Sequence, residues 1–164
     1  MLTTQQNAAL KAAIIADATL NALPNTIDSA FEIAAVFNTE ASPAFYVWRS
    51  SVTVDEIMQN GFDWTRVDNL TIGKARIWEW MTAAASLHPN QANVRAGFLA
   101  VFTTAGDLSN RNAIATHIQR LATRAEKLFA TGAGTASTDQ FAGPATMGFE
   151  GALSYQDCFT ARNS

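Results

Sequence analysis

The sequence predicts an all-α fold, a compact multi-helix bundle that carries a long extended C-terminal arm. Apolar residues recur at helical spacing through residues 1–131. Helix-capping signals stand before several of these segments, and residues 132–143 are dominated by glycine, alanine, serine and threonine, a composition typical of flexible linkers. We therefore expect a helical body at 1–131 and a C-terminal arm at 132–164, made of a flexible linker at 132–143 and a docking segment at 144–162.

The composition favours a subunit of an assembly. Charged residues make up 15% of the 164 residues, below the roughly 25% usual in soluble domains. Neutral polar residues or neighbouring chains must therefore cover much of the surface. The net charge of −3 is too small to steer the chain toward nucleic acid or an anionic membrane.

The charge is nevertheless unevenly distributed. Residues 1–40 carry one basic and four acidic residues, whereas residues 91–130 carry five basic and two acidic ones. These regions could meet between subunits, or they could simply be solvated helix faces. The single cysteine, Cys158, excludes an internal disulfide and fits folding in a reducing cytoplasm. No apolar run approaches a membrane-spanning length.

Two helices are expected at the N-terminus. Thr3 or Thr4 is expected to cap the first, which should end near Asn21 because Leu23-Pro24 disfavours a continuing helix. Its apolar side carries Leu10, Ile14 and Ile15. Asn25 or Thr26 is expected to cap a second, largely buried helix with Phe31, Ile33, Ala34, Ala35, Val36 and Phe37.

Residues 42–66 carry both helix and strand signals. Ser42-Pro43 can start a short helix or an extended segment, and residues 44–48 have strand-like side chains but are too few to decide. Thr53 with Glu56 three residues later is a capping box for a short helix. Residues 62–66 are expected to form a loop whose aromatic side chains fold back onto the body.

Three helices are then expected between residues 70 and 121. The first spans about Leu70 to Leu87, where Gly73 would mark a close contact with another backbone. The second follows an Asn90 cap and ends before Gly106. The third restarts at Asp107 or Ser109. Their expected buried stripes are Leu70, Ile77, Met81 and Ala84; Val94, Phe98, Val101 and Phe102; and Ile114, Ile118 and Leu121. The body should hold about six or seven helices.

The boundary between body and arm lies at residues 123–135. Thr123 and Glu126 form another capping box, and Gly132 can close the short helix in the left-handed conformation. Alternating apolar residues from Met147 to Tyr155 suit a strand that pairs elsewhere. A last helix capped by Ser154 and running to Arg162 is the alternative. The residues expected to grip another chain are Met147, Phe149, Leu153, Tyr155 and Phe159.

For each residue that could serve catalysis, a cofactor or a metal, a purely structural role explains the sequence better. His88 and His117 lack other ligands at metal-binding spacing, and Cys158 has no nearby histidine in the sequence, which favours a passive thiol. Trp78 and Trp80 point about 160° apart on a helix, so only one can face the core. The expected subunit contacts are Trp78, Trp80, Arg111, Arg120 and Arg124.

Four strings in the chain resemble a family of small proteins encoded among the head genes of tailed bacteriophages and prophages. They are Thr123-Arg-Ala-Glu-Lys-Leu-Phe-Ala-Thr-Gly132, Met147-Gly-Phe-Glu-Gly-Ala-Leu-Ser-Tyr-Gln-Asp157, Leu20-Asn-Ala-Leu-Pro-Asn25 and Ser42-Pro-Ala-Phe-Tyr-Val-Trp-Arg49. The chain departs from the family pattern between Phe62 and Trp80 and at Cys158, where the family has an aliphatic residue.

The resemblance implies a virion structural protein that is not an enzyme, a head-to-tail adaptor made in the bacterial host cytoplasm. Such adaptors form a homo-oligomeric ring, here expected to be a dodecamer, under the portal protein at the head-tail junction. The ring extends the DNA channel, through which DNA passes without sequence-specific binding, and attaches the tail or nozzle protein. No membrane and no cofactor are implied.

Two alternatives stay open at this stage. One is another virion structural role, as a tail-completion or head-decoration protein. The other is a lytic enzyme acting on cell-wall glycan, with Glu79 as the acid because the flanking Trp78 and Trp80 can raise a carboxyl pKa.

Overall fold

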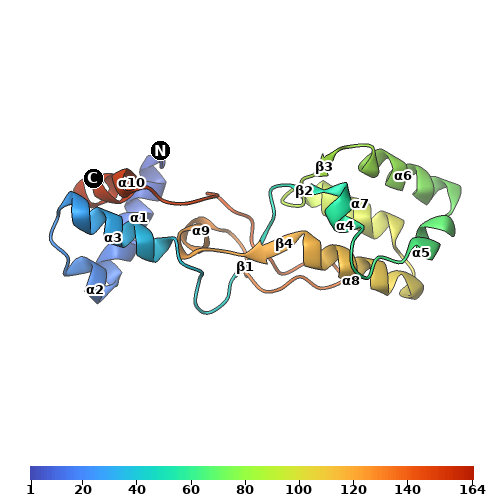
Figure 1. Cartoon of the computed structure of the whole chain (residues 1–164), viewed down its shortest axis with the longest axis horizontal. Helices are drawn as coiled ribbons and strands as arrows, with labels where there is room; N and C mark the ends of the chain where they lie inside the picture. Colours follow the sequence, from blue (N-terminus) through green and yellow to red (C-terminus); the bar gives the residue numbers. More distant parts are fainter. The chain divides into compact units, whose positions relative to one another are not determined.

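A computed structural model describes residues 1–164 and is predominantly helical, as predicted (Figure 1). The chain forms ten α-helices, one 3-10 helix and four short strands. The strands form two two-stranded sheets, one of β1 and β4 and one of β2 and β3. The expected number of six or seven helices is too small because several helices span only four or five residues, too short for periodicity to reveal.

The bounds of the elements follow chain order. They are α1 (Thr4–Ala16), α2 (Ala18–Asn21), α3 (Ile27–Phe37), β1 (Tyr46–Trp48), β2 (Val52–Thr53), α4 (Val54–Ile57), α5 (Trp64–Asp68), α6 (Ile72–Thr82), β3 (Ser86–Leu87), α7 (Ala92–Val101), η1 (Ala105–Asp107), α8 (Leu108–His117), β4 (Gln119–Leu121), α9 (Arg124–Phe129) and α10 (Tyr155–Asn163).

The chain divides into two compact units. Unit 1 contains residues 1–45, 121–131 and 147–164, and unit 2 contains residues 46–120 and 132–146. One boundary between the units falls after residue 131. The residues beyond it, however, are divided between the two units and do not form one part of their own.

Unit 1 is built from α1, α2, α3, α9 and α10. Its core holds Leu10 and Ile14 of α1, the α3 residues Ala30, Ile33, Ala34 and Phe37, and Leu153, Cys158 and Ala161 from the C-terminal stretch. Three residues that were expected in the core are exposed: Ile15 by 55%, Phe31 by 54%, and Ala35. Each lies one helical position beside the buried stripe, so the rest of unit 1 covers its neighbours and not the residue itself.

The first helix breaks at Asp17. Its carboxylate Oδ1 accepts the backbone N–H groups of Thr19 and Leu20 at 3.1 and 3.2 Å. Asp17 therefore caps a new helix, α2, because its side chain satisfies amides that would otherwise lack partners.

Unit 2 has an aromatic core. The Trp78 ring lies 5.6 Å from the Phe62 ring and 5.3 Å from the Phe102 ring, between centroids. The loop expected at 62–66 is wrong beyond Asp63, because Asp63 Oδ1 accepts the Thr65 N–H at 2.9 Å and caps α5. Local carboxylate capping thus starts a helix that the short apolar pattern did not indicate.

The helix expected at residues 70–87 is shorter than predicted. It runs as α6 from Ile72 to Thr82, and Ser86–Leu87 form β3. Leu87 pairs with Val52 and Ser86 with Thr53 in an antiparallel ladder. A strand partner more than thirty residues away in sequence therefore overrides the helical pattern at this end.

The ambiguous segment at 44–48 contains a strand, β1. Trp48 N–H donates to the Ala145 carbonyl at 3.0 Å, and Ala145 N–H donates to the Tyr46 carbonyl at 2.9 Å. The segment with strand-like side chains therefore finds its backbone hydrogen-bond partner at Ala145, just after the glycine-rich stretch.

The long extended C-terminal arm is not confirmed. In the stretch expected as a flexible linker, Phe141 is only 4% exposed, and Ala145 just beyond it is fully buried. Gly132, at φ 131°, lies so close to this stretch that an added Cβ would be 3.0 Å from the Ala145 Cα. Glycine and alanine here permit close backbone packing instead of free movement.

The end of the chain is a helix. Ser154 caps α10 through its Oγ, which accepts the Asp157 N–H at 3.1 Å, and Asp157 completes a capping box. The alternative with a last helix is confirmed, whereas Met147 to Ser154 contains no strand. No helix in the chain is both long enough and apolar enough to cross a bilayer.

Candidate functional site

The five residues expected to grip another chain lie in unit 1 and differ in exposure. Leu153 is 3% exposed and its N–H donates to Asn38 Oδ1 at 2.8 Å, so it serves the core. Met147 and Phe149 are half-buried, and the Phe149 ring lies 5.5 Å from Phe129. Tyr155 is half-buried and Phe159 is 37% exposed. Of the five, Phe159 is the most exposed, and Leu153 is the one whose burial keeps it from a partner.

Tyr155 and Phe159 belong to an apolar surface formed by α3 and α10. The Tyr155 ring stacks on Phe31 with 4.3 Å between ring centroids. Ile27 and Phe31, one turn apart on α3, are each 54% exposed. We call Ile27, Phe31, Tyr155 and Phe159 the α3–α10 patch.

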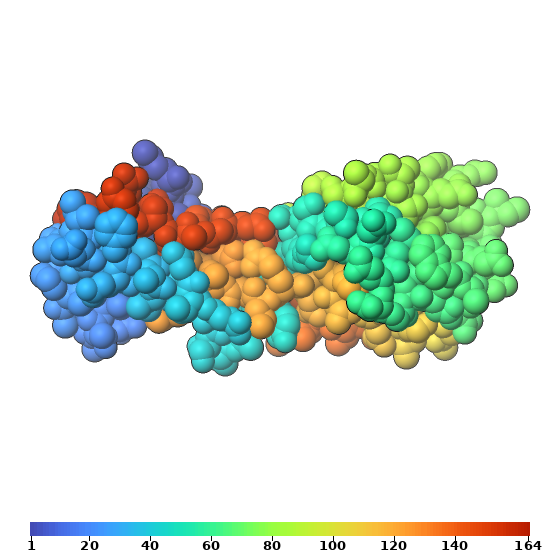
Figure 2. Space-filling model, in the orientation of Figure 1, coloured from blue at the N-terminus to red at the C-terminus, as the bar shows by residue number.

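The two helices of the patch run antiparallel. The Arg162 guanidinium near the end of α10 donates to the carbonyls of Leu23 and Pro24, at 2.8 and 3.0 Å, just before α3 begins. The Leu153 carbonyl before α10 accepts the side-chain amide of Asn38, which follows α3. Figure 2 shows C-terminal residues, in red, lying against N-terminal residues, in blue, on the surface of unit 1.

The other side of α10 is buried and carries the thiol of Cys158. Cys158 has no exposed surface, and burial raises the pKa of its thiol to about 12. The group is therefore protonated at neutral pH and a poor nucleophile. This agrees with the passive role that the sequence suggested for it.

The tryptophans of α6 separate as predicted. Trp78 is 6% exposed and packs in the aromatic core, whereas Trp80 is 70% exposed. Of the two expected subunit contacts on this helix, only Trp80 is available to another molecule. The expected buried stripe is shifted, because Ala84 is exposed while Ile77 and Met81 are half-buried.

A hollow of about 370 Å³ lies beside α5 and α6 in unit 2. Its wall includes two carboxylates, Asp68 and Glu79, and the indole of Trp64, which is 57% exposed; Val67, Leu70, Ala75 and Trp78 complete it. Sequence reasoning singled out Glu79 but missed Asp68, because the two are eleven positions apart and on different helices. Only the fold brings both to one hollow.

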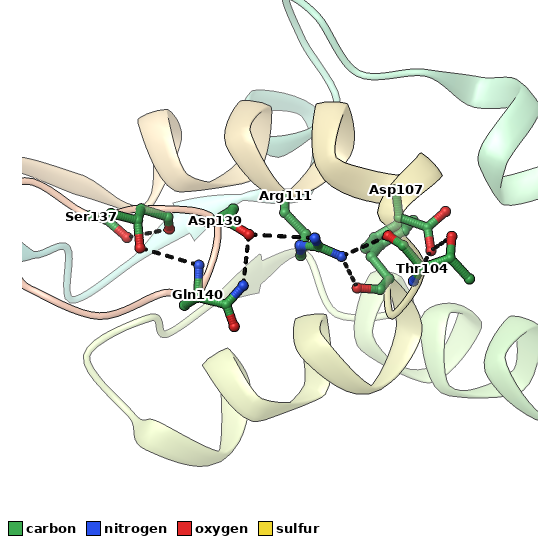
Figure 3. A network of polar contacts seen from close by, with 8 residues as sticks. Thr104, Asp107, Arg111, Ser137, Asp139 and Gln140 are labelled. Atoms are coloured by element: carbon green, nitrogen blue, oxygen red, sulfur yellow. Dashed lines mark hydrogen bonds and ion pairs between the residues drawn. The ribbon is translucent and has the colours of Figure 1, made fainter.

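Arg111, an expected subunit contact, is 8% exposed and its guanidinium is used within unit 2 (Figure 3). One terminal nitrogen donates to the carbonyls of Phe102 and Thr104 at 2.8 and 3.0 Å. The other is 3.4 Å from Asp139 Oδ2, and Gln140 donates to the same oxygen at 2.6 Å. Arg111 thus ties the 132–146 segment to α8.

The other two expected arginine contacts are partly buried. Arg124 lies 3.3 Å from Asp17 Oδ2 and places its guanidinium 5.4 Å from the Phe37 ring centroid. One basic residue of the 91–130 region therefore meets one acidic residue of the N-terminal region within the same unit. Hydrogen bonding to the Leu20 N–H and to Arg124 lowers the Asp17 pKa. Arg120 is half-buried on β4.

The two histidines lie where structural roles account for them. His88 Nδ1 lies 2.7 Å from the Ser50 carbonyl, to which it must donate because a carbonyl only accepts. His117 is the last residue of α8. No three histidine, cysteine or acidic side chains gather in a way that could hold a metal ion.

A scan against models of known protein families, a search of curated proteins and a search of solved structures found no match to this chain.

Proposed function

We propose that this protein is a virion structural protein of a tailed bacteriophage, a head-to-tail adaptor located at the head-tail junction. In this role it forms a ring under the portal protein, extends the DNA channel and attaches the tail. The resemblance of four strings to phage head-module proteins suggests the setting. The α3–α10 patch is the observation that carries the docking step.

The strings that carry the resemblance gather largely in unit 1. Residues 20–25, 123–131 and 147–157 belong to it, and its buried Glu126 links two of these strings. Glu126 accepts the Thr123 N–H at 3.0 Å and the Gly151 N–H at 3.1 Å. Unit 1 is therefore the part of the chain most suited to a role shared with that family.

The α3–α10 patch supports docking on another protein. Ile27 and Phe31 are more than half exposed and Phe159 is 37% exposed, and covering apolar surface contributes about 25 cal/mol per Å². Aromatic side chains that lie together on a surface are enriched at the centres of protein interfaces. The C-terminal segment would then dock as a packed helix, without extending as an arm. An extended arm would require Leu153, Cys158 and Ala161 to leave the core of unit 1, at a cost of several kcal/mol.

The proposal is tested by making the patch polar. We expect the double variant Phe31→Ser and Phe159→Ser to keep its helical content, since both side chains are largely exposed, and to lose attachment to portal-bearing heads of the encoding phage. Co-sedimentation with purified heads measures attachment. Ile15→Ser is a matched control, because Ile15 is 55% exposed in unit 1 but lies outside the patch.

The position on the particle separates the adaptor role from other virion roles. Electron microscopy of labelled particles should place the protein as a ring at one vertex. Copies spread over the shell would instead indicate a decoration protein. If the double variant attaches as well as the wild type, the patch is not the docking surface.

The hollow of unit 2 favours one second candidate, a cell-wall glycan hydrolase. Glycoside hydrolysis needs two carboxyl groups on either side of the bond that is cleaved, and Asp68 and Glu79 line the same hollow beside the exposed Trp64 indole. A sugar ring could stack on that indole. This function predicts that the protein clears a peptidoglycan suspension and that Glu79→Gln abolishes clearing while the fold is kept. No clearing by the wild-type protein at any pH would eliminate it.

A further inference from the structure

One face of α6 is exposed and has no partner within the chain. Ile72 is 82% exposed and Trp80 is 70% exposed. Arg76 and Glu79 are also exposed, as is Ala83, the residue that ends the helix. Side chains at positions i, i+4, i+7 and i+11 share one helical face. We call Ile72, Arg76, Glu79 and Ala83, with the adjoining Trp80, the α6 face.

The α6 face carries two opposite charges that are not used inside the molecule. Neither the Arg76 guanidinium nor the Glu79 carboxylate has an ion-pair or hydrogen-bond partner in the chain, whereas the arginines at 49, 66, 111 and 124 all have carboxylate partners. The face therefore presents one unpaired cation and one unpaired anion, separated by about one helical turn.

The spacing of the α6 face reads the same in both directions. The intervals from Ile72 to Arg76, Glu79 and Ala83 are four, three and four residues. An antiparallel second copy of α6, related by a two-fold axis midway along this stretch, brings Arg76 opposite Glu79 twice. Ile72 then lies opposite Ala83. The charges are thus complementary to those of the same face turned around.

The shape of the face also suits this arrangement. Nothing lies within 4 Å of the place where a Cβ on Gly73 would be. The register that places Arg76 opposite Glu79 places Trp80 of one copy opposite Ala75 of the other, two positions from Gly73. A large exposed indole thus meets a stretch of small residues, and tryptophan is among the residues that contribute most to interfaces.

We propose that α6 is a homotypic contact surface, on which two copies of this chain pair through antiparallel α6 helices. Reciprocal Arg76–Glu79 ion pairs and the Trp80 indoles hold the two copies together. An isologous contact of this kind is complete once two copies have paired. The proposed dimer is therefore a state of the free protein. It does not rest on the proposed docking through the α3–α10 patch.

Charge reversal tests the pairing and its direction. Sedimentation velocity over a concentration series should show that the wild type dimerises. Arg76→Glu or Glu79→Arg alone replaces both ion pairs by like charges and should weaken dimerisation about tenfold or more. The double variant with both changes restores opposite charges and should recover the wild-type affinity. Glu32→Arg, a reversal on the exposed part of α3, should leave dimerisation unchanged.

Mixing the two single variants gives the sharpest readout. Neither single variant pairs well with itself, but each copy of Arg76→Glu offers two anions to the two cations of Glu79→Arg. An equimolar mixture should therefore form heterodimers. A wild type that stays monomeric at its highest soluble concentration would overturn the proposal. So would single reversals that dimerise like the wild type, or a mixture that stays monomeric while circular dichroism shows both variants folded.

Discussion

At Phe141 the backbone conformation favours glycine, whereas the buried environment favours a large apolar side chain. Its φ of 50° lies in the left-handed region, which costs a residue with a side chain about 1–2 kcal/mol. Its ring is 4% exposed and lies 5.6 Å from the Phe98 ring centroid. Burial of the ring therefore stabilises a backbone conformation that would otherwise favour glycine.

This conflict predicts an unusual order of stabilities. Phe141→Ala and Phe141→Gly both lose the buried ring, at about 3–5 kcal/mol. Glycine normally destabilises relative to alanine, but here it removes the left-handed penalty, so Phe141→Gly should be the more stable of the two by about 1 kcal/mol. Urea unfolding followed by tryptophan fluorescence measures both. At Phe98, inside α7, the alanine variant should be the more stable one. The same order at both positions would contradict the explanation.

Glu56 predicts a defined pH dependence. Hydrogen bonds from the Thr53 backbone and from Arg49 lower the pKa of its carboxyl from 4.5 to about 2. Because the pKa is lower in the folded state, the carboxylate stabilises the fold above about pH 4.5. This contribution is lost as the pH falls toward 2.

The Glu56→Gln variant isolates that contribution. Wild type should be more stable than the variant at pH 7, and the difference should shrink between about pH 4.5 and pH 2. Comparing the two proteins by urea unfolding cancels the effects of other carboxyl groups. A difference that does not change across this pH range would contradict the role given to Glu56.

At the scale of elements, α10 is part of the core of unit 1. Leu153, Cys158 and Ala161 are all buried, and Asn38 exchanges two hydrogen bonds with the Leu153 backbone. Deleting residues 147–164 should therefore unfold much of unit 1, because several buried side chains lose their neighbours at once.

The deletion distinguishes a core helix from a dispensable arm. Hydrogen exchange should show loss of protection in α1 and α3, and circular dichroism should show less helix than removal of α10 alone explains. Removal of Asn163 and Ser164 only, both exposed, should have little effect. If the long deletion left α1 and α3 protected, α10 would behave as the arm that the sequence suggested.

At the scale of the whole molecule, the two units carry separate natural probes. All four tryptophans lie in unit 2, and the single cysteine, Cys158, lies in unit 1. Fluorescence therefore reports on unit 2, and reaction of the buried thiol with a labelling reagent reports on unit 1.

Glu126→Ala should affect these probes differently. The buried carboxylate accepts two backbone N–H groups in unit 1, so its removal should destabilise that unit by about 2–4 kcal/mol. We expect Cys158 to become reactive at clearly lower urea concentration, while the fluorescence midpoint moves less. Equal shifts of both probes would mean that the two units unfold as one cooperative system. Glu32→Gln, on the surface of α3, is the control.

The residues of a single turn were enough to predict several helix starts, but those capped by Asp17 and Asp63 were missed. The capping boxes at Thr53, Thr123 and Ser154 are all present, and the opposite directions of Trp78 and Trp80 follow from helical geometry alone. Caps and side-chain directions depend on atoms within a few residues, so the sequence by itself determined them, together with the helical class.

Only the tertiary structure decided what depends on residues distant in the chain. The glycine-rich 132–146 segment packs in unit 2, Ser86–Leu87 pair with Val52–Thr53, and Phe31 lies at the surface beside α10. Asp68 and Glu79 share one hollow for the same reason. Composition indicates how freely a segment can move in isolation, but whether it packs depends on the complementary surface that another part of the chain provides.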